Sequence, residues 1–219
     1  MYIYIMEINK LFIATIITIL VNLSSNIKKT SDKNMIDITP LPLTFSIWPI
    51  IYGLLLYTTY RDSKDMESIA TLFYISCILN CMWLYTWGKS TMLAGLILIL
   101  LTSIIIYITS YIGTKSTSKL LLYTFAIYAT WLFIASILNI SIILIKNNIM
   151  ANSSIKIIVA LLLSLLPLIL NYSIPGFNKV IIPILLTLVW ACMGIVLNKK
   201  NNYIFGVPLL ISLIQLVKN

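Results

Sequence analysis

The sequence contains no histidine, a single arginine and little acidic charge, with six Asp and Glu among 219 residues. Two of its three cysteines, Cys77 and Cys81, are four residues apart, but no histidine and no second close cysteine pair is available to complete a tetrahedral metal site. We therefore expect no zinc site and no histidine-ligated haem iron, and we interpret the cysteines as small apolar core residues.

Charged residues are also missing from the middle of every long apolar run. Pumps and proton- or ion-coupled carriers keep such groups inside the membrane, because coupling needs a side chain that binds an ion or changes its charge. The sequence has no glycine-rich phosphate loop, no nucleophile elbow, and no acid and base pair within the apolar runs. These absences disfavour an ion-coupled carrier and an enzyme, and they leave a ligand-binding protein or a passive facilitator.

Apolar residues, by contrast, are abundant: they make up 60% of the chain and give a mean hydropathy of +1.02. A soluble domain has about 45–50% apolar residues. The apolar runs are about 18 to 25 residues long and lack the alternating pattern of a barrel strand. They predict an all-α integral membrane protein, a polytopic helical bundle that crosses the membrane several times.

About eight transmembrane helices are predicted, with seven as the alternative. They are expected at residues 11–23, 43–60, 68–87, 91–112, 120–145, 155–170, 180–197 and 203–217. The last run covers only about 22 Å as a helix and contains Pro208, which favours a kinked, tilted or re-entrant segment. The first run also resembles the apolar core of a signal peptide, but no small-x-small cleavage site follows it, so we expect a retained helix.

The formal net charge of +9 comes largely from lysines placed singly and in pairs at the ends of the runs. This distribution is typical of anchoring at a membrane surface, and no nucleic acid partner is expected. Alternate loops carry similar numbers of basic residues, so the orientation in the membrane stays undetermined. The longest polar segment, residues 24–42, is predicted to be an exposed loop that proline stiffens at its end.

Inside the runs, aromatic and amide side chains recur at helical spacing. The three groups are Thr44, Trp48 and Tyr52; Asn80, Trp83 and Trp87; and Tyr128, Trp131, Ala135 and Asn139. Residues three, four or seven apart share one face of a helix. If the three faces converge, they line a cavity with flat aromatic walls and a few hydrogen-bonding groups, which suits a planar apolar ligand.

These groups also have a structural interpretation. Indole rings near the ends of spans anchor helices at the membrane interface, and this applies to Trp48, Trp83, Trp87 and Trp190. Trp131 lies well inside its run, where interfacial anchoring does not explain it. The two asparagines inside spans, Asn80 and Asn139, are explained equally well by hydrogen bonding between helices.

The same residues resemble motifs of the translocator protein and tryptophan-rich sensory protein family (TspO/MBR). Residues 40–52 are similar to the proline-containing entry to its second helix, where a Trp is followed four residues later by a Tyr. Residues 80–83 resemble its Asn-x-x-Trp on the third helix, and residues 128–139 resemble its fifth-helix pattern of Tyr, Trp, Ala and Leu-Asn. The resemblance covers about residues 8–145, and residues 189–194 are similar to a stretch in longer bacterial members.

This resemblance implies a five-helix membrane core over residues 1–146, with additional helices over residues 147–219 packed on it. It implies a membrane receptor or sensor, not an enzyme, that binds porphyrin, haem or a sterol-like lipid in an aromatic cavity with the first loop as lid. A passive transporter or facilitator of a lipid or small metabolite is the alternative. The predicted ligand-binding residues are Trp48, Tyr52, Asn80, Trp83, Trp87, Tyr128, Trp131 and Asn139.

The expected partners are membrane lipids and the hydrophobic ligand, and a homodimer stays open. No resident cofactor or metal is predicted, although porphyrin or haem is a candidate ligand. Because the chain has no histidine, we expect the aromatic rings to stack on a porphyrin rather than any side chain to ligate its iron.

Overall fold

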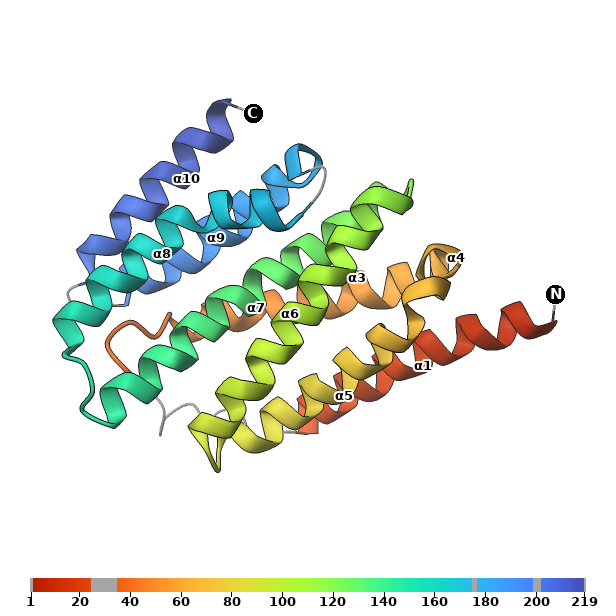
Figure 1. Ribbon diagram of the computed structural model, residues 1–219, viewed down its shortest axis with the longest axis horizontal. Helices are drawn as coiled ribbons and strands as arrows, with labels where there is room; N and C mark the ends of the chain where they lie inside the picture. The colour runs from red at the N-terminus through yellow and green to blue at the C-terminus, as the bar shows by residue number, and fades with distance from the viewer. Residues whose placement is uncertain (1, 25–34, 175–176, 199–201, 219) are drawn as a thin grey trace.

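The computed structural model describes residues 2–24, 35–174, 177–198 and 202–218, with side chains from residue 10 onward. Eight long helices run through this part of the chain (Figure 1): α1 (Tyr2–Ser24), α3 (Ile47–Arg61), α5 (Ala70–Trp87), α6 (Thr91–Lys115), α7 (Lys119–Lys146), α8 (Asn152–Ser173), α9 (Ile181–Val196) and α10 (Gly206–Lys218). Shorter helical turns are η1 (Pro42–Ser46), α4 (Ser63–Met66), η2 (Glu67–Ile69), η3 (Phe177–Lys179) and η4 (Tyr203–Phe205).

The helices confirm the predicted polytopic bundle. Among the described residues, five helical segments are long and apolar enough to cross a membrane: Pro42–Arg61, Ser63–Trp87, Thr91–Lys115, Lys119–Lys146 and Asn152–Ser173. Three apolar helices, Lys10–Ser24, Ile181–Val196 and Tyr203–Lys218, are shorter. Of the predicted polar loop 24–42, residues 25–34 lie outside the described part.

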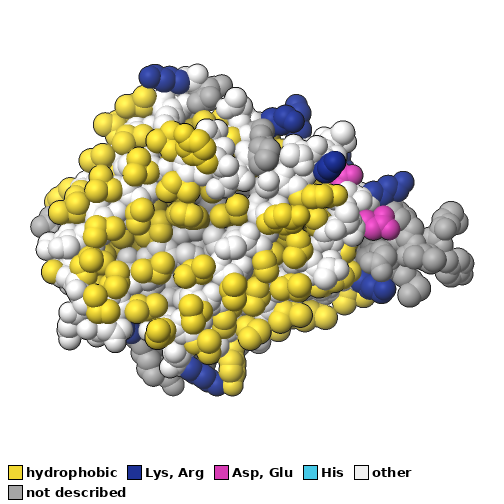
Figure 2. All heavy atoms as spheres, viewed as in Figure 1, with side chains coloured by type: hydrophobic (Ala, Val, Ile, Leu, Met, Phe, Trp, Pro, Cys, Tyr) yellow, Lys and Arg dark blue, Asp and Glu magenta, His cyan; other side chains and the backbone are white. Residues whose placement is uncertain are grey.

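Apolar side chains are spread over the face seen in Figure 2, while lysine, arginine and acidic groups lie toward its margins. Exposed Leu and Ile side chains occur along the outer faces of the long helices. A broad apolar exterior bounded by charged ends is the surface that a lipid bilayer requires. The chain is therefore an integral, multi-pass membrane protein.

Helix α7 is the centre of the bundle. It contacts α3, α6, α8 and α9, with α8–α10 on one side and α1 and α5 on the other (Figure 1). Of its apolar window, 61% is buried inside the protein, against 39–44% for the other four candidate spans. Side chains on several faces of α7 therefore meet protein rather than lipid.

The contact between α6 and α7 depends on small and hydroxyl-bearing residues. A Cβ atom on Gly95 would lie 2.8 Å from Asn139 Oδ1, so glycine allows the two helices to approach closely. Farther along the contact, Thr102 Oγ1 and Ser136 Oγ are 2.9 Å apart and share a hydrogen bond. These polar contacts fix the register of two helices that are otherwise lined with Leu and Ile.

Three prolines lie in the first turn of a helix, where they do not interrupt it. Pro49, Pro183 and Pro208 are each the third residue of α3, α9 and α10, where an N–H group has no partner inside the helix. Pro208 therefore does not lie in the interior of α10, where it would kink the helix, and α10 continues to Lys218. Only Pro167, in α8, lies inside a helix of the described part.

The segment that leads into α3, residues 35–46, is held by the C-terminal helices. We call it the entry segment. Its Leu41 N–H donates to the carbonyl oxygen of Gly194 at 3.0 Å, and Trp190 Nε1 donates to the carbonyl oxygen of Thr44 at 2.8 Å. Thr44, which shares its predicted helix face with Trp48, is buried and contacts α9 at Gly194.

Further contacts fix the beginning of the entry segment. Asn198 Nδ2 donates to the Thr39 carbonyl oxygen at 2.5 Å, and Asn202 Nδ2 donates to the Asp37 carbonyl oxygen at 2.7 Å. Lys156 Nζ lies 3.5 Å from Asp37 Oδ2. The residues beyond 147 therefore hold the approach to the second long helix, although the division into two units stays a prediction.

Substitution of Gly194 by Ala should destabilise the bundle. The added Cβ would lie 1.9 Å from Thr44 Oγ1, so α9 and the entry segment must move apart at a cost of about 1–3 kcal/mol. The measurement is the unfolding midpoint in detergent. Gly53→Ala is the matched control, because nothing lies within 4 Å of its added Cβ. Equal midpoints for the two variants would contradict this packing.

Candidate functional site

Asn80, in the middle of α5, is the centre of a buried polar network. Its side chain has 0% exposure. Asn80 Oδ1 accepts a hydrogen bond from Asn22 Nδ2 at 2.9 Å, and Asn80 Nδ2 donates to the Tyr128 hydroxyl oxygen at 2.9 Å. The amide thus joins α1, α5 and α7 through one side chain.

Tyr52, from α3, completes the network. Its hydroxyl group donates to Asn22 Oδ1 at 2.6 Å and also approaches Asn80 Oδ1 at 3.3 Å. Asn22 Nδ2 makes a second bond to the Thr18 carbonyl oxygen at 2.7 Å. Two amides and two phenols from four helices therefore satisfy one another without a charged group.

Asn22 is the member of this network that sequence reasoning missed. It lies at the end of the first apolar run, where an asparagine is easily assigned to the following polar loop. The available signal was its spacing, because Thr15, Thr18 and Asn22 are three and four residues apart on one helix face and all three are buried.

Aromatic rings from α3, α5 and α7 pack next to the network, with Trp48 at their centre. Trp48 stacks on Tyr52 with ring centroids 5.5 Å apart and packs against Trp83 at 5.9 Å. The edges of Tyr128 and Trp131 meet it at 6.1 Å and 6.4 Å. These spacings are the favoured ones for aromatic pairs, so the five rings form one cohesive cluster.

Two more rings extend the cluster. Trp87 stacks on Trp83 at 5.9 Å, and Phe45 of the entry segment meets Trp131 edge-on at 6.0 Å. Phe45 was not among the predicted site residues. The entry segment thus contributes an aromatic side chain to the cluster as well as leading the chain into α3.

The positions of the tryptophans separate the two interpretations of their role. Trp83 and Trp131 expose only 7% and 2% of their surfaces and face the interior, whereas Trp190 exposes 36% and lies outside the cluster. Of the predicted positions, Trp48, Tyr52, Asn80, Trp83, Trp87, Tyr128 and Trp131 come together. Their role in ligand binding stays a prediction.

Asn139, the eighth predicted position, lies in a different contact. It is buried against Gly95 of α6, two helical turns beyond Trp131, where an interhelical role is the closer fit. Its Oδ1 atom has no hydrogen-bond partner among the described residues. Helical spacing predicted that Asn139 lies close to the face of α7 that carries Trp131. Because other helices surround α7, two adjacent faces of α7 contact different helices, and Asn139 contacts α6.

Two buried donors in the aromatic cluster also lack acceptors. The indole Nε1 atoms of Trp83 and Trp131 have no hydrogen-bond partner in the described part of the chain. A buried donor left unpaired costs about 1–3 kcal/mol. A hydrogen-bond acceptor placed beside either indole nitrogen would recover this cost.

The rings pack against one another between the helices. Two cavities of the described part lie elsewhere, between the α3–α4 turn and the loop that joins α6 to α7. A ligand in the cluster must therefore displace ring contacts as it enters. No group of three or more Cys, Asp or Glu in the described part is arranged to hold a metal ion.

The fold and this site define a multi-pass helical membrane protein with a buried, uncharged cluster of aromatic and amide side chains. A family model described as TSPO-like protein matches residues 4–218, and the chain belongs to this family. The family expected from the three motifs is confirmed, and the match continues through the C-terminal helices. Comparison with curated proteins and with solved structures gave no match.

Removing the central amide tests the network. Asn80→Leu should lower the free energy of unfolding by about 1–3 kcal/mol, because it removes an acceptor of Asn22 Nδ2 and the amide that donates to the Tyr128 hydroxyl oxygen. Unfolding in mixed detergent micelles measures the change. Asn171→Leu, at an exposed position of α8, is the control. Adding Asn22→Leu to Asn80→Leu should cost less than the sum of the single changes, and strict additivity would contradict the network.

Proposed function

We propose that this protein is a membrane receptor or sensor that binds a planar hydrophobic ligand among the rings of α3, α5 and α7. One observation carries the proposal: Trp83 and Trp131 hold buried indole N–H groups without acceptors, within a cluster of stacked and edge-on rings. Aromatic faces supply the contact area for a flat ligand, and the two donors supply its orientation.

The chemistry of the cluster restricts the ligand. Its described side chains are uncharged, and the neighbouring amide network is already paired within itself. The ligand class that fits is a flat ring system with a few hydrogen-bond acceptors, such as a porphyrin, haem or a sterol-like lipid carrying a carbonyl or hydroxyl oxygen. An apolar ligand reaches such a site from the bilayer, which surrounds the exposed faces of the helices.

Binding without turnover is the activity that these residues support. The cluster offers no acid and base pair and no activated nucleophile among its side chains, so the proposal includes no chemical step. A passive facilitator would use the same residues but would also move its solute across the membrane. Solute flux into liposomes therefore distinguishes transport from binding.

Protoporphyrin is the probe for the first test. Trp131→Leu should weaken its binding about tenfold, because the variant removes one ring surface, worth about 0.5–1.5 kcal/mol per aromatic contact, and one of the two indole donors without an acceptor. Titration of the porphyrin absorption band measures affinity without relying on tryptophan fluorescence. Trp190→Leu also removes an indole, but outside the cluster, and should retain most of the affinity.

A detergent-only titration gives the background for this experiment. Equal affinity of the two tryptophan variants, or binding no stronger than that of empty micelles, would overturn the proposed site. If the unaltered protein, reconstituted in liposomes, carried the ligand rapidly across the membrane, the protein would be a facilitator and not a receptor.

The iron of haem should contribute little to binding. The chain has no histidine, so we expect haem and metal-free protoporphyrin to bind with affinities within about tenfold of each other through ring contacts. Competition between the two on the same protein measures the ratio. A hundredfold preference for haem, with the absorption shift of a newly ligated iron, would show that a side chain ligates the metal.

A further inference from the structure

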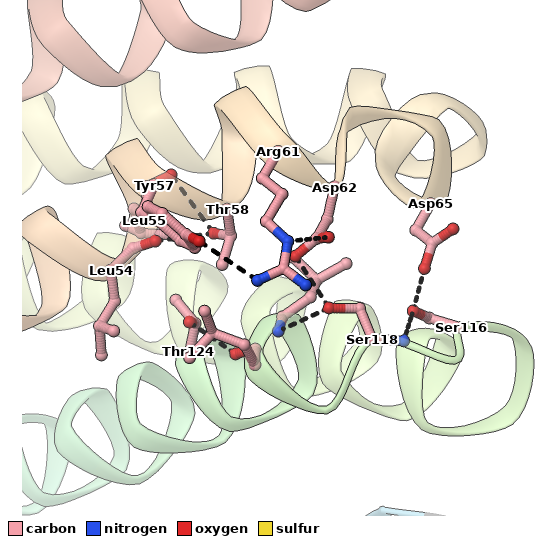
Figure 3. A network of polar contacts seen from close by, with 12 residues as sticks. Leu54, Leu55, Tyr57, Thr58, Arg61, Asp62, Asp65, Ser116, Ser118 and Thr124 are labelled. Atoms are coloured by element: carbon pink, nitrogen blue, oxygen red, sulfur yellow. Dashed lines mark hydrogen bonds and ion pairs between the residues drawn. The ribbon is translucent and has the colours of Figure 1, made fainter.

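A polar groove lies far from the aromatic cluster, where α3 ends and α7 begins. We call it the rim groove. Its walls are the turn at residues 61–65 and the loop at residues 115–120 (Figure 3). The larger of its two adjoining cavities has a volume of about 720 Å³ and the smaller about 230 Å³. Small-ligand sites commonly have about 300–1,000 Å³.

The two carboxylates of the rim groove are engaged within the protein. Asp62 accepts a hydrogen bond from Ser118 Oγ at 2.8 Å, and Asp65 accepts one from Ser116 Oγ (Figure 3). The Asp62 side chain is only 11% exposed. These bonds tie the α3–α4 turn to the loop between α6 and α7, so the carboxylates build the walls of the groove.

Unlike the carboxylates, the basic side chains of the groove are exposed to solvent. Arg61, Lys64 and Lys119 line the larger cavity, and Lys115 lines the smaller one. All four are exposed, and the Arg61 side chain is 59% exposed although its Nε lies 3.7 Å from Asp62 Oδ1. Four cations against two carboxylates leave the rim groove with positive charge that faces outward.

The position of the groove at the ends of candidate membrane spans predicts that it lies at the level of the lipid headgroups. It caps the ends of three apolar helices, α3, α6 and α7. Three exposed tyrosines lie on α3 and α6 about one or two helical turns from the groove, toward the middle of these helices: Tyr57, Tyr60 and Tyr107. Tyrosine at such positions marks the interface between hydrocarbon and headgroups. Arg61 Nη1 also donates to the Tyr57 hydroxyl oxygen at 3.2 Å, which holds the guanidinium beside this belt.

We propose that the rim groove binds the phosphate group of an anionic membrane lipid. Arg61 and Lys119 hold the phosphate from the two walls, Lys64 and Lys115 add charge beside them, and the acyl chains extend along the exposed tyrosines. The serine-bonded carboxylates keep the two walls together, and the basic side chains lie on the exposed side of the groove. The site is separate from the aromatic cluster and does not depend on its ligand.

The test is a lipid titration of the full-length chain in detergent, followed by native mass spectrometry and by the unfolding midpoint. Phosphatidylglycerol is compared with phosphatidylcholine of the same acyl chains. Phosphatidylglycerol should bind more tightly and raise the midpoint, and sodium chloride should weaken its binding. Arg61→Gln with Lys119→Gln should weaken it roughly 30-fold, because each basic group near an anionic lipid surface contributes a factor of about five.

Lys89→Gln with Lys146→Gln is the matched control, because it removes the same charge at the opposite ends of α5 and α7. It should leave the affinity for phosphatidylglycerol within about twofold, since charges that far apart are screened. Asp62→Asn keeps an oxygen that accepts from Ser118 but removes a negative charge, and it should tighten binding severalfold.

Three results would overturn the proposal. The first is equal binding of the two lipids, and the second is an equal loss in the two double variants. The third is binding of glycerol 3-phosphate or inorganic phosphate as tight as that of phosphatidylglycerol, which would assign the rim groove to a soluble phosphate instead of a lipid.

Discussion

An amide side chain inside an apolar bundle has to find its hydrogen-bonding partners within the protein, because hydrocarbon supplies none. Asn80 meets this requirement through Asn22, Tyr52 and Tyr128, which come from three other helices. The geometry of these bonds fixes the rotation of α1, α3, α5 and α7 about their axes. Leu and Ile contacts alone tolerate many rotations, so the network selects one arrangement of the bundle.

That selected rotation also assembles the aromatic cluster. Tyr52 and Tyr128 place their hydroxyl groups in the network and their rings against Trp48, so polar pairing and ring packing share the same side chains. Trp83 and Trp131 differ, because their rings are packed while their N–H groups stay unpaired in the described structure. Two of the buried polar atoms without a partner in the described structure therefore lie where the flat apolar surfaces meet.

Hydropathy and motif spacing were sufficient to predict the helices, the family and seven of the residues that gather around the network, because each depends on local sequence. They were not sufficient for Asn139 or for Pro208. Helical spacing gives the face on which Asn139 lies but not which helix covers that face, and here α6 does. Pro208 was expected to distort a helix, but its effect depends on where α10 begins, which hydropathy leaves undefined by a few residues. Asn22 was missed because it lies at the end of its apolar run, where hydropathy does not separate a buried helical amide from the polar loop that follows.

The bonds between the entry segment and the C-terminal helices have a consequence for biosynthesis. Thr44, Thr39 and Asp37 offer carbonyl oxygens whose partners lie 146, 159 and 165 residues later in the chain. A ribosome therefore releases the entry segment long before the side chains that pair with it exist. Until α9 and the residues that follow it have been synthesised, those carbonyl groups must be satisfied by water or by the insertion machinery. Final docking of the segment is therefore among the last steps of folding.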